Sequence, residues 1–428
     1  MSTYNKIETA SIDELRNLQN TRLTALVKRL YKTVPFYKKQ FDKIGLSPDD
    51  IKSVDDLHKI PFTKKTDLRD NYPYDMFAKP MDEISRIHAS SGTTGKPTVV
   101  GYTKNDLDVF DEVVARSLMC AGARSGMKLH NAYGYGLFTG GLGMHGGATK
   151  LGMAVIPVSG GMTERQLTIL QDFKPEVICC TPSYAQTLSE EFAKRNINTK
   201  NLAVKFAILG AEPWTEAIRQ QVEKGLNVDA TNIYGLSEII GPGVSQEDFE
   251  EKGTGSYIWE DHFYPEIVDK ETGKPLPYGE EGVLVFTTLT KEAFPLLRYW
   301  TNDICSIDYD KNAKRTHIKM SSIKGRADDM LIIRGVNLFH TQVEEVIHKI
   351  DELSPNYRLI VSKKGTMDAV TVEVETKKSA NTSKGDLSLQ LTKKIKDIVG
   401  LSMSVDLKEP NSIPRSQGGK LSRIVDNR

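Results

Sequence analysis

The sequence lacks a long apolar run and an excess of either charge. No stretch approaches the roughly 18 consecutive apolar residues that a membrane-spanning helix needs. The first eight residues show no basic segment leading into an apolar one, as a secretion signal would. The 57 basic and 56 acidic residues leave a net charge of +1, so no overall field favours nucleic acid or an anionic membrane. We therefore expect a cytoplasmic protein that binds neither.

Cysteine is also scarce. The four cysteines, Cys120, Cys179, Cys180 and Cys305, do not have the spacing of metal ligands. The adjacent pair lies in an apolar, strand-like run, which favours reduced core residues over a disulfide framework. Neither a redox motif nor a cysteine-rich metal site is indicated.

The length and the order of the patterns predict two domains. At 428 residues the chain exceeds the about 250 to 300 residues at which single cores stop growing. Residues 1–85 read mainly as helices, and from 154 to 233 strand-like runs alternate with helical ones, which is typical of an α/β domain with substantially parallel strands. A charged turn at 325–337 precedes a small α+β pattern. We place the boundary there, with domains at 1–326 and 327–428.

The stretch from Ser90 to Pro97, Ser-Ser-Gly-Thr-Thr-Gly-Lys-Pro, is typical of a phosphate-binding loop. Hydroxyls can donate to phosphate oxygens, glycines allow backbone N–H groups to approach an anion, and the lysine supplies a positive charge. The spacing differs from the Walker A pattern. A solvated turn between two strands is the alternative. The strands expected on either side would make a hairpin.

Two further segments follow predicted parallel strands, where ligands of α/β domains gather. They are Gly210 to Trp214 and Tyr234 to Glu238. The second offers an aromatic face for a purine and a carboxylate, and a carboxylate is a hard ligand suited to magnesium. Asp303 could accept both hydroxyls of a ribose, or could be an exposed turn aspartate.

The segment Asn131 to His145 interleaves aromatic side chains with five glycines. Flat side chains beside exposed backbone could line a narrow apolar slot. A glycine-rich helix start with aromatic core residues is the alternative.

In this order the segments resemble the motif set of the phenylacetate-CoA ligase family of acyl-adenylate-forming enzymes. The resemblance rests on Ile87 to Thr103, Asn131 to Gly143, Gly210 to Trp214, Ile233 to Gly243, Trp259 to His262, Asp303, Gly325 to Asn337 and the terminal Pro-Arg-Ser with Gly-Lys. It implies an α/β fold whose large N-terminal domain holds parallel and mixed sheets, followed by a small mobile α+β domain. It also implies ATP, Mg²⁺ and coenzyme A, a small aromatic carboxylic acid, and a homodimer. The acid would first form an acyl-adenylate, and the CoA thiol would then displace AMP.

The resemblance implies these residue roles. The catalytic residues would be Lys420, Glu238 and Lys96, with Glu238 also holding magnesium and Asp328 serving as the hinge. The nucleotide would contact Ser90, Ser91, Gly92, Thr93, Thr94, Gly95, Gly210, Ala211, Glu212, Pro213, Tyr234, Gly235, Ser237, Asp303 and Arg326. The acid would contact Tyr133, Tyr135, Phe138, Gly140, Gly141, Ile240, Gly241 and Pro242.

Three departures from the family pattern stand out. Many members carry a cysteine pair suited to structural zinc before the hinge, whereas residues 310–317 keep only the Arg-Thr-His end, so we predict no zinc. One extra residue lies before Lys420, which affects its register. His340 and Thr341 replace a common Pro-Ser pair, with no functional reading.

Two alternatives to a CoA ligase remain open. One is an adenylating enzyme that passes AMP or the acyl group to another acceptor, as members resembling coenzyme F390 synthetase do. The other is a nucleotide-binding regulatory module without turnover. The presence of Lys96, Glu238, Asp303 and Lys420 argues against the second.

Overall fold

A helical layer opens the chain in the computed structural model, which describes residues 3–90, 97–327, 331–333, 336–364, 367–415 and 422–428. Helix α1 (Ile12–Thr33) begins at Ser11, whose hydroxyl accepts the Glu14 N–H while the Glu14 carboxylate accepts the Ser11 N–H. Helix α2 (Pro35–Lys43) starts with proline, as first helical positions allow. Short 3₁₀ turns and α3 (Lys65–Asp70) follow. The helical expectation for 1–85 is confirmed.

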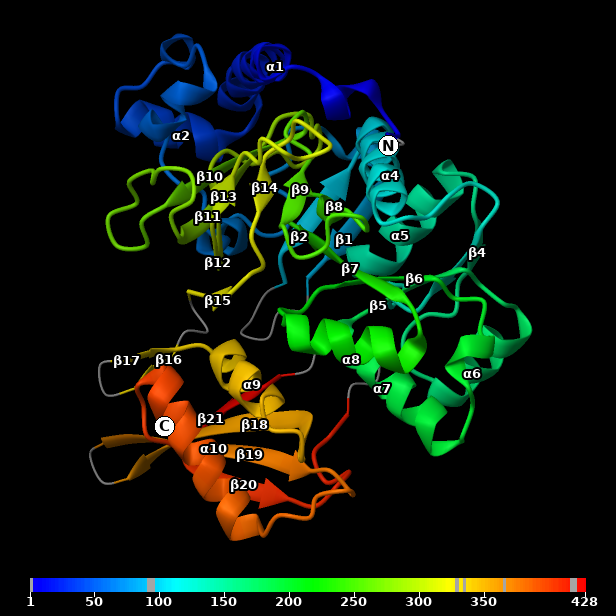
Figure 1. Ribbon diagram of the computed structural model, residues 1–428. Coiled ribbons are helices and arrows are strands. Elements are labelled where there is room, and N and C mark those ends of the chain that lie inside the picture. Colours follow the sequence, from blue (N-terminus) through cyan, green and yellow to red (C-terminus); the bar gives the residue numbers. More distant parts are fainter. Residues whose placement is uncertain (1–2, 91–96, 328–330, 334–335, 365–366, 416–421) are drawn as a thin grey trace.

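A nine-stranded sheet forms the centre of the molecule (Figure 1). Five parallel neighbours come first: β4 (Ala154–Ile156), β3 (Lys128–Asn131), β5 (Val177–Cys180), β6 (Phe206–Gly210) and β7 (Asp229–Leu236). Antiparallel strands then extend it: β8 (Gly241–Glu247), β9 (Ser256–Ile258), β14 (Lys319–Met320) and β13 (Ile307–Asp308). The predicted α/β class with mixed sheets is confirmed.

Successive residues of the parallel strands enter two different cores. Cys179 packs with the core that includes α4 (Lys104–Cys120) and α5 (Thr139–Lys150). Cys180 packs with the core of α6 (Thr163–Asp172), α7 (Pro182–Lys194) and α8 (Glu216–Leu226). Helices therefore cover both faces, which is why these strands are apolar throughout rather than alternating. All four cysteines are buried and free.

A second sheet holds four antiparallel strands, β10 (Phe263–Val268), β11 (Gly282–Thr288), β12 (Tyr299–Cys305) and β15 (Gly325–Arg326). A separate hairpin pairs β1 (Arg86–Ala89) with β2 (Val99–Tyr102), as predicted for the two sides of the phosphate-binding segment.

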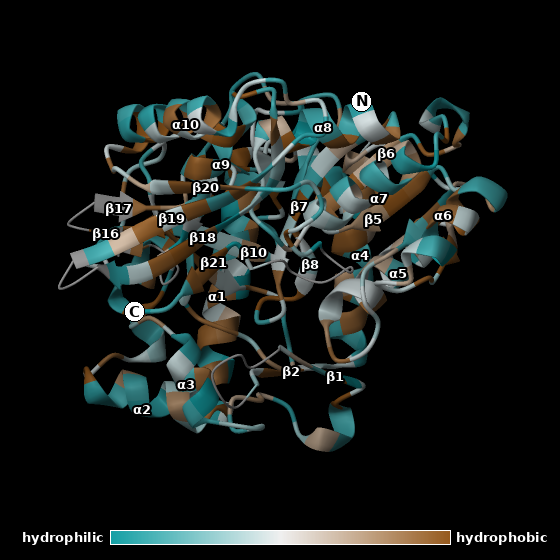
Figure 2. Cartoon of the chain, turned by 90° about the horizontal axis from the view of Figure 1, so that it is seen from below, coloured by the Kyte–Doolittle hydropathy of each residue, from teal (hydrophilic) through white to brown (hydrophobic). Residues whose placement is uncertain are grey.

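The C-terminal part has its own apolar core. Strands β16 (Leu331–Ile333) and β17 (Val336–Leu338) form a hairpin before α9 (His340–His348). The sheet order is β20 (Ser404–Lys408), β19 (Met367–Thr376), β18 (Leu353–Lys364), β21 (Ile424–Asp426), with α10 (Lys384–Val399) packed against it. In Figure 2 the strands β18 and β19 are largely brown, whereas α10 shows much more teal. The predicted small α+β unit is present.

Two expectations about local structure need correction. The segment from Tyr234 was expected to be a loop, but Tyr234, Gly235 and Leu236 continue β7. The reason is the pairing of Gly235 with Pro242 in β8, which extends the strand as an antiparallel hairpin. Likewise Gly210 is the last residue of β6, not the first of a loop.

Candidate active site

The predicted phosphate-binding segment lies between two joined strand ends. Ser90 donates its N–H to the Thr98 carbonyl at 2.9 Å, and its hydroxyl accepts the Thr98 N–H at 3.2 Å. Ala89 donates to the carbonyl of Leu137, which brings the aromatic and glycine-rich segment beside the hairpin. The six residues from 91 to 96 lie outside the described residues.

Tyr234, Asp303 and Arg326 come together where the two sheets meet. The Tyr234 hydroxyl donates to Asp303 Oδ2 at 2.6 Å, and Arg326 Nη1 lies 3.7 Å from Asp303 Oδ1. Asp303 and Arg326 are direct partners across β12 and β15. Because Asp303 is only 8% exposed and lies within a strand, the exposed-turn alternative is wrong.

The electrostatics of this cluster follow from burial. Burial raises the pKa of the Tyr234 hydroxyl far above its ordinary value, and the neighbouring Asp303 charge adds to that rise. Tyr234 therefore stays protonated and keeps donating to the carboxylate. With a cation on the opposite side, Asp303 is fixed as an acceptor for further hydroxyl donors.

Glu238 is a buried carboxylate just beyond β7, 6% exposed. Lys65 Nζ of α3 lies 3.8 Å from its Oε1. Burial, and secondly the charge of Glu238, raise the pKa of Tyr299. Burial lowers the pKa of Lys291 to about 8, an effect that the negative charges of Asp106 and Glu238 oppose. A hard oxygen ligand in this setting fits magnesium.

The residue before it, Ser237, joins the end of β7 to α5. Its hydroxyl pairs with that of Thr139 at 3.0 Å. Thr139 is the first residue of α5 and is buried. The start of α5 is thereby fixed against the Tyr234 to Glu238 segment.

Close contacts, a left-handed φ and hydrogen bonds constrain the segment 210–213. A Cβ on Gly210 would lie 2.2 Å from the Ile233 carbonyl oxygen, so only glycine fits. Ala211 has a φ of +73°, in the left-handed region. The Glu212 carboxylate accepts from the Ser183 hydroxyl at 3.0 Å and from its N–H at 3.2 Å. Pro213, half-buried, completes the turn.

The aromatic residues of the predicted acid slot differ in burial. Tyr133 is 7% exposed, and its buried hydroxyl oxygen has no hydrogen-bond partner within the described ranges. The Tyr135 hydroxyl accepts from Asn131 Nδ2 at 2.9 Å and pairs with His145 Nδ1 at 3.1 Å. Phe138 is 51% exposed. These three side chains therefore do not share one environment.

Two glycines of the predicted slot are required by packing. A Cβ on Gly141 would lie 2.5 Å from the Gly134 carbonyl oxygen, and one on Gly241, at a φ of +116°, would lie 2.5 Å from the Phe110 ring. Gly140 is looser, with Tyr133 as its neighbour at 3.6 Å. Gly140 and Gly141 lie in the first turn of α5, and the acid slot stays a prediction.

The other end of the slot lies at β8. Ile240 is buried and its carbonyl accepts the Tyr102 hydroxyl at 2.8 Å. Thr139 would also meet a Cβ on Gly241, at 2.9 Å, so the starts of α5 and β8 are in contact. Pro242, half-buried, follows in the strand. The structure brings both ends of the predicted slot together.

Three predicted sites cannot be placed. The segment from Ser91 to Lys96, the hinge Asp328 and Lys420 all lie outside the described residues. Sequence reasoning also missed four residues that contact the predicted ones: Lys65, Thr139, Ser183 and Tyr299. None carries a local signal, because each reaches the site only through tertiary packing.

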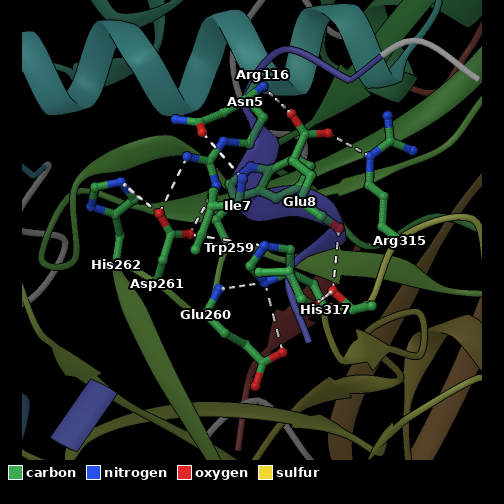
Figure 3. A network of polar contacts seen from close by, with 12 residues as sticks. Asn5, Ile7, Glu8, Arg116, Trp259, Glu260, Asp261, His262, Arg315 and His317 are labelled. Carbon is green, nitrogen blue, oxygen red and sulfur yellow. Dashed lines mark hydrogen bonds and ion pairs between the residues drawn. The ribbon is translucent and has the colours of Figure 1, made fainter. Parts of the chain in front are cut away.

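A polar network contains Arg315 and His317 (Figure 3). These residues belong to the Arg-Thr-His stretch that remains where many members of the resembled family have a zinc-binding pattern. Arg315 Nε lies 2.7 Å from Glu8 Oε2, and Arg315 also pairs with Asp248. His317 Nδ1 accepts the Glu260 N–H at 3.2 Å, so its other nitrogen carries the proton when the ring is neutral. The network ties the N-terminal segment to the sheet.

Within the described ranges, no group of three or more histidine, cysteine, aspartate or glutamate side chains is arranged to hold a metal ion. The described chain also contains no helix long and apolar enough to cross a membrane. The absence of zinc stays a prediction.

Comparison with known proteins identifies the family. A model of AMP-binding enzymes matches residues 13–289, and one of their C-terminal domain matches residues 335–428. The chain belongs to the AMP-binding enzymes, in the family of the phenylacetate-coenzyme A ligases. The enzyme of that name from Thermus thermophilus is 58% identical over 440 residues, covering 99% of each chain. The Escherichia coli K12 enzyme is 51% identical over 427 residues, covering 99% of this chain and 97% of its own.

Solved structures allow the placement of the C-terminal part relative to the N-terminal part to be compared. One match is the crystal structure of 2-hydroxyisobutyryl-CoA ligase in the postadenylation state in complex with 2-HIB-AMP. Its sequence is 26% identical, and the match covers 99% of this chain and 92% of that chain at a TM-score of 0.93. In the thioesterification state with CoA, the same enzyme at the same coverage reaches 0.73. Since the sequence match is the same, the difference in score reflects how the parts are placed. This chain therefore superposes better on the postadenylation structure of that enzyme than on its thioesterification structure.

Proposed function

We propose that this protein is an ATP-dependent ligase that converts an arylacetic acid, phenylacetate above others, into its CoA thioester, releasing AMP and pyrophosphate. Near-full-length identity of 58% to a phenylacetate-coenzyme A ligase carries the proposal. The cluster of Tyr234, Asp303 and Arg326 supports it, because the Tyr234 hydroxyl near the end of the parallel strand β7 and the Arg326 cation fix the buried carboxylate of Asp303.

The reaction has two steps. A carboxylate oxygen of the acid attacks the α-phosphorus of ATP, the bond to the β-phosphate oxygen breaks, and pyrophosphate leaves. The CoA thiolate then attacks the carbonyl carbon of the acyl-adenylate, and AMP leaves with the oxygen that bridged the two groups. Positioning and electrostatic stabilisation supply most of the catalysis in such phosphoryl chemistry.

The proposal includes the following nucleotide roles. Asp303 accepts the ribose hydroxyls, with Arg326 beside it. Tyr234 and the following Gly235 lie against the adenine, and the rigid turn of Gly210, Ala211, Glu212 and Pro213 borders the adenosine. Ser90, Ser91, Gly92, Thr93, Thr94, Gly95 and Lys96 hold the β- and γ-phosphates, with Ser237 beside them.

Glu238 is the proposed magnesium ligand. Its carboxylate is buried beside the nucleotide cluster, and magnesium takes one or two protein carboxylates with phosphate oxygens and water. When bound, the ion neutralises charge on the phosphates. Glu238 itself orients the phosphate side of the site.

Lys420 is the proposed catalytic lysine of the first step, placing a positive charge between the acid carboxylate and the α-phosphate. The proposal includes two domains, 1–326 and 327–428, with Asp328 as the pivot. Rotation about it carries Lys420 away before the thiol reacts.

The acid is proposed to lie between the start of α5 and the start of β8. Tyr133, Tyr135, Phe138 and Gly140 would border its ring, with Ile240, Gly241 and Pro242 closing the other end and Gly141 holding the backbone. One methylene in such a pocket changes binding by only about 1 to 3 kcal/mol, so close homologues compete. We also propose a cytoplasmic homodimer.

A panel assay tests this function. Pyrophosphate release and thioester formation are measured with ATP, magnesium, CoA and each of phenylacetate, hydroxyphenylacetates, indoleacetate, benzoate and medium-chain fatty acids. Thioester formation fastest with an arylacetate supports the proposal. Pyrophosphate release without thioester favours transfer to another acceptor, and nucleotide binding without turnover favours a regulatory module.

A further inference from the structure

Glu190 of α7 is held by two donors from the C-terminal part. Its Oε1 accepts from Asn356 Nδ2 at 3.0 Å, and its Oε2 accepts from Arg415 Nε at 3.1 Å. Each carboxylate oxygen thus has a donor from β18 or from the terminal segment. The Glu190 side chain is 28% exposed, so these contacts are partly shielded from water.

Arg415 is already fixed within the C-terminal part. Its two Nη atoms lie 2.8 and 2.7 Å from the two oxygens of Glu375, whose side chain is 1% exposed. Glu375 also accepts the Ile413 N–H at 2.7 Å. Burial alone would raise the pKa of Glu375, yet these bonds keep it below its ordinary value. Only the Nε edge of the Arg415 fork reaches Glu190.

A preorganised guanidinium makes the contact with Glu190 specific to one geometry. The Arg415 side chain loses little further freedom on meeting Glu190, because the fork is fixed before the two parts meet. A rotation of the C-terminal part moves Arg415 and Asn356 together, since both belong to it. Both bonds to Glu190 would then break at once.

The arrangement that makes these bonds has a known counterpart. It matches the postadenylation state of the 2-hydroxyisobutyryl-CoA ligase, at a TM-score of 0.93, and departs from the thioesterification state, at 0.73.

We propose that Glu190 is a positioning residue for the first half-reaction, holding the C-terminal part through Arg415 and Asn356 while the acyl-adenylate forms. This inference rests on the proposed function. Glu190 contacts neither nucleotide nor acid site residues in the described chain. Its effect is confined to the half-reaction that uses this arrangement.

The next residue of α7 supplies a matched control. Glu191 carries the same charge, but its partners are Lys194 at 2.7 Å and Arg195, both at the end of its own helix. The variants are Glu190→Gln, Glu190→Lys, Glu191→Gln and Glu191→Lys. A thermal melt of each shows that it is folded, and Glu190→Gln keeps the test usable if the lysine variant is not.

Two half-reactions are measured separately for each variant. The first is acid-dependent ATP–pyrophosphate exchange, and the second is thioester formation from synthetic phenylacetyl-adenylate and CoA. Glu190→Gln should slow exchange about two- to fivefold, as expected for a half-buried ion pair. Glu190→Lys, which faces Arg415 with a like charge, should slow it about tenfold or more. The second half-reaction should keep its rate or rise, and both Glu191 variants should match the parent.

Equal slowing of both half-reactions, or parent-like exchange in Glu190→Lys, would overturn the inference. If the parent enzyme catalyses both half-reactions but the Glu190 variants behave like the Glu191 variants, the role of Glu190 is rejected. The proposed function then still stands. A folded parent silent in both half-reactions with every arylacetate rejects the proposed function, and the inference with it.

Discussion

The Tyr234 hydroxyl donates to the Asp303 carboxylate at 2.6 Å, joining the end of β7 in the large sheet to β12 in the smaller one. Sixty-nine residues of sequence separate the two. The contact fixes the distance between an aromatic side chain and a carboxylate. The proposed nucleotide site therefore depends on how the two sheets are joined.

Asp303→Asn should raise the KM for ATP about tenfold or more, because a neutral amide accepts ribose hydroxyls more weakly and leaves Arg326 without its counter-charge. The KM for the acid should change little. Steady-state kinetics with varied ATP and varied acid separate the two. Asp308→Asn, in the exposed edge strand β13, is the control. An unchanged KM for ATP would remove Asp303 from the nucleotide site.

Lys420→Ala should reduce the rate of adenylate formation by about 10² to 10³, because the charge that stabilises the transition state is lost. Thioester formation from synthetic adenylate should continue. Rapid-quench measurement of adenylate decides the matter. If the variant forms adenylate at the parent rate while thioester formation falls, the assignment of this lysine to the first step is wrong.

Glu238→Gln should shift the magnesium titration of pyrophosphate release to higher concentrations and lower the maximal rate about 10²-fold. The amide retains the size of the side chain but not the charge that a hard cation requires. Glu271→Gln, in an exposed turn, serves as the control. A titration midpoint equal to that of the parent would contradict the metal role.

Glu112 should make folding sensitive to acid. Although burial alone would raise its pKa, bonds to His262 and Arg116 lower it from 4.5 to about 2. A carboxyl with a depressed folded-state pKa contributes stability that is present above pH 4.5 and is lost as the pH falls towards 2. Glu112→Gln should lower the free energy of unfolding by about 1 to 3 kcal/mol near neutral pH and flatten its pH dependence between 4.5 and 2. Urea unfolding at several pH values measures both, and an unchanged slope would contradict the prediction.

Gly241→Ala should destabilise the fold and the acid pocket together. The added Cβ would lie 2.5 Å from the Phe110 ring at a φ of +116°, and we expect a loss of about 1 to 3 kcal/mol. Gly134→Ala, where no atom lies within 4 Å, should have little effect. Thermal melts of both variants test this, and equal melting temperatures would refute the packing argument.

Much of the fold could be predicted because local patterns and tertiary structure agree. The apolar, strand-like run that holds the adjacent pair Cys179 and Cys180 is the strand β5. The sequence did not decide between a helix and an aromatic slot for α5, because its five glycines weaken helix propensity. Its glycines instead allow close approach to α4, as Gly143 does against Phe110. Only the packed structure reveals that reason.

The residues of the proposed site were named from the sequence, but the contacts among them were not. The sequence indicated separate roles for Tyr234 and Asp303, yet their hydrogen bond depends on two sheets meeting. Thr139, Ser183 and Glu190 gave no local signal, because each acts through contacts with residues of other elements. The long extension of β7 was missed since Gly235 and Gly241 resemble turn residues, whereas here they let two strands approach closely.

Oxygen-labelled phenylacetate offers the most direct test of the two-step reaction. The enzyme is given ATP, magnesium, CoA and phenylacetate carrying ¹⁸O in both carboxylate oxygens, and the products are analysed by mass spectrometry. Attack of the carboxylate on the α-phosphorus predicts one labelled oxygen in AMP and one in the carbonyl of phenylacetyl-CoA. Label in inorganic phosphate with release of ADP, or unlabelled AMP beside the thioester, would contradict an acyl-adenylate intermediate.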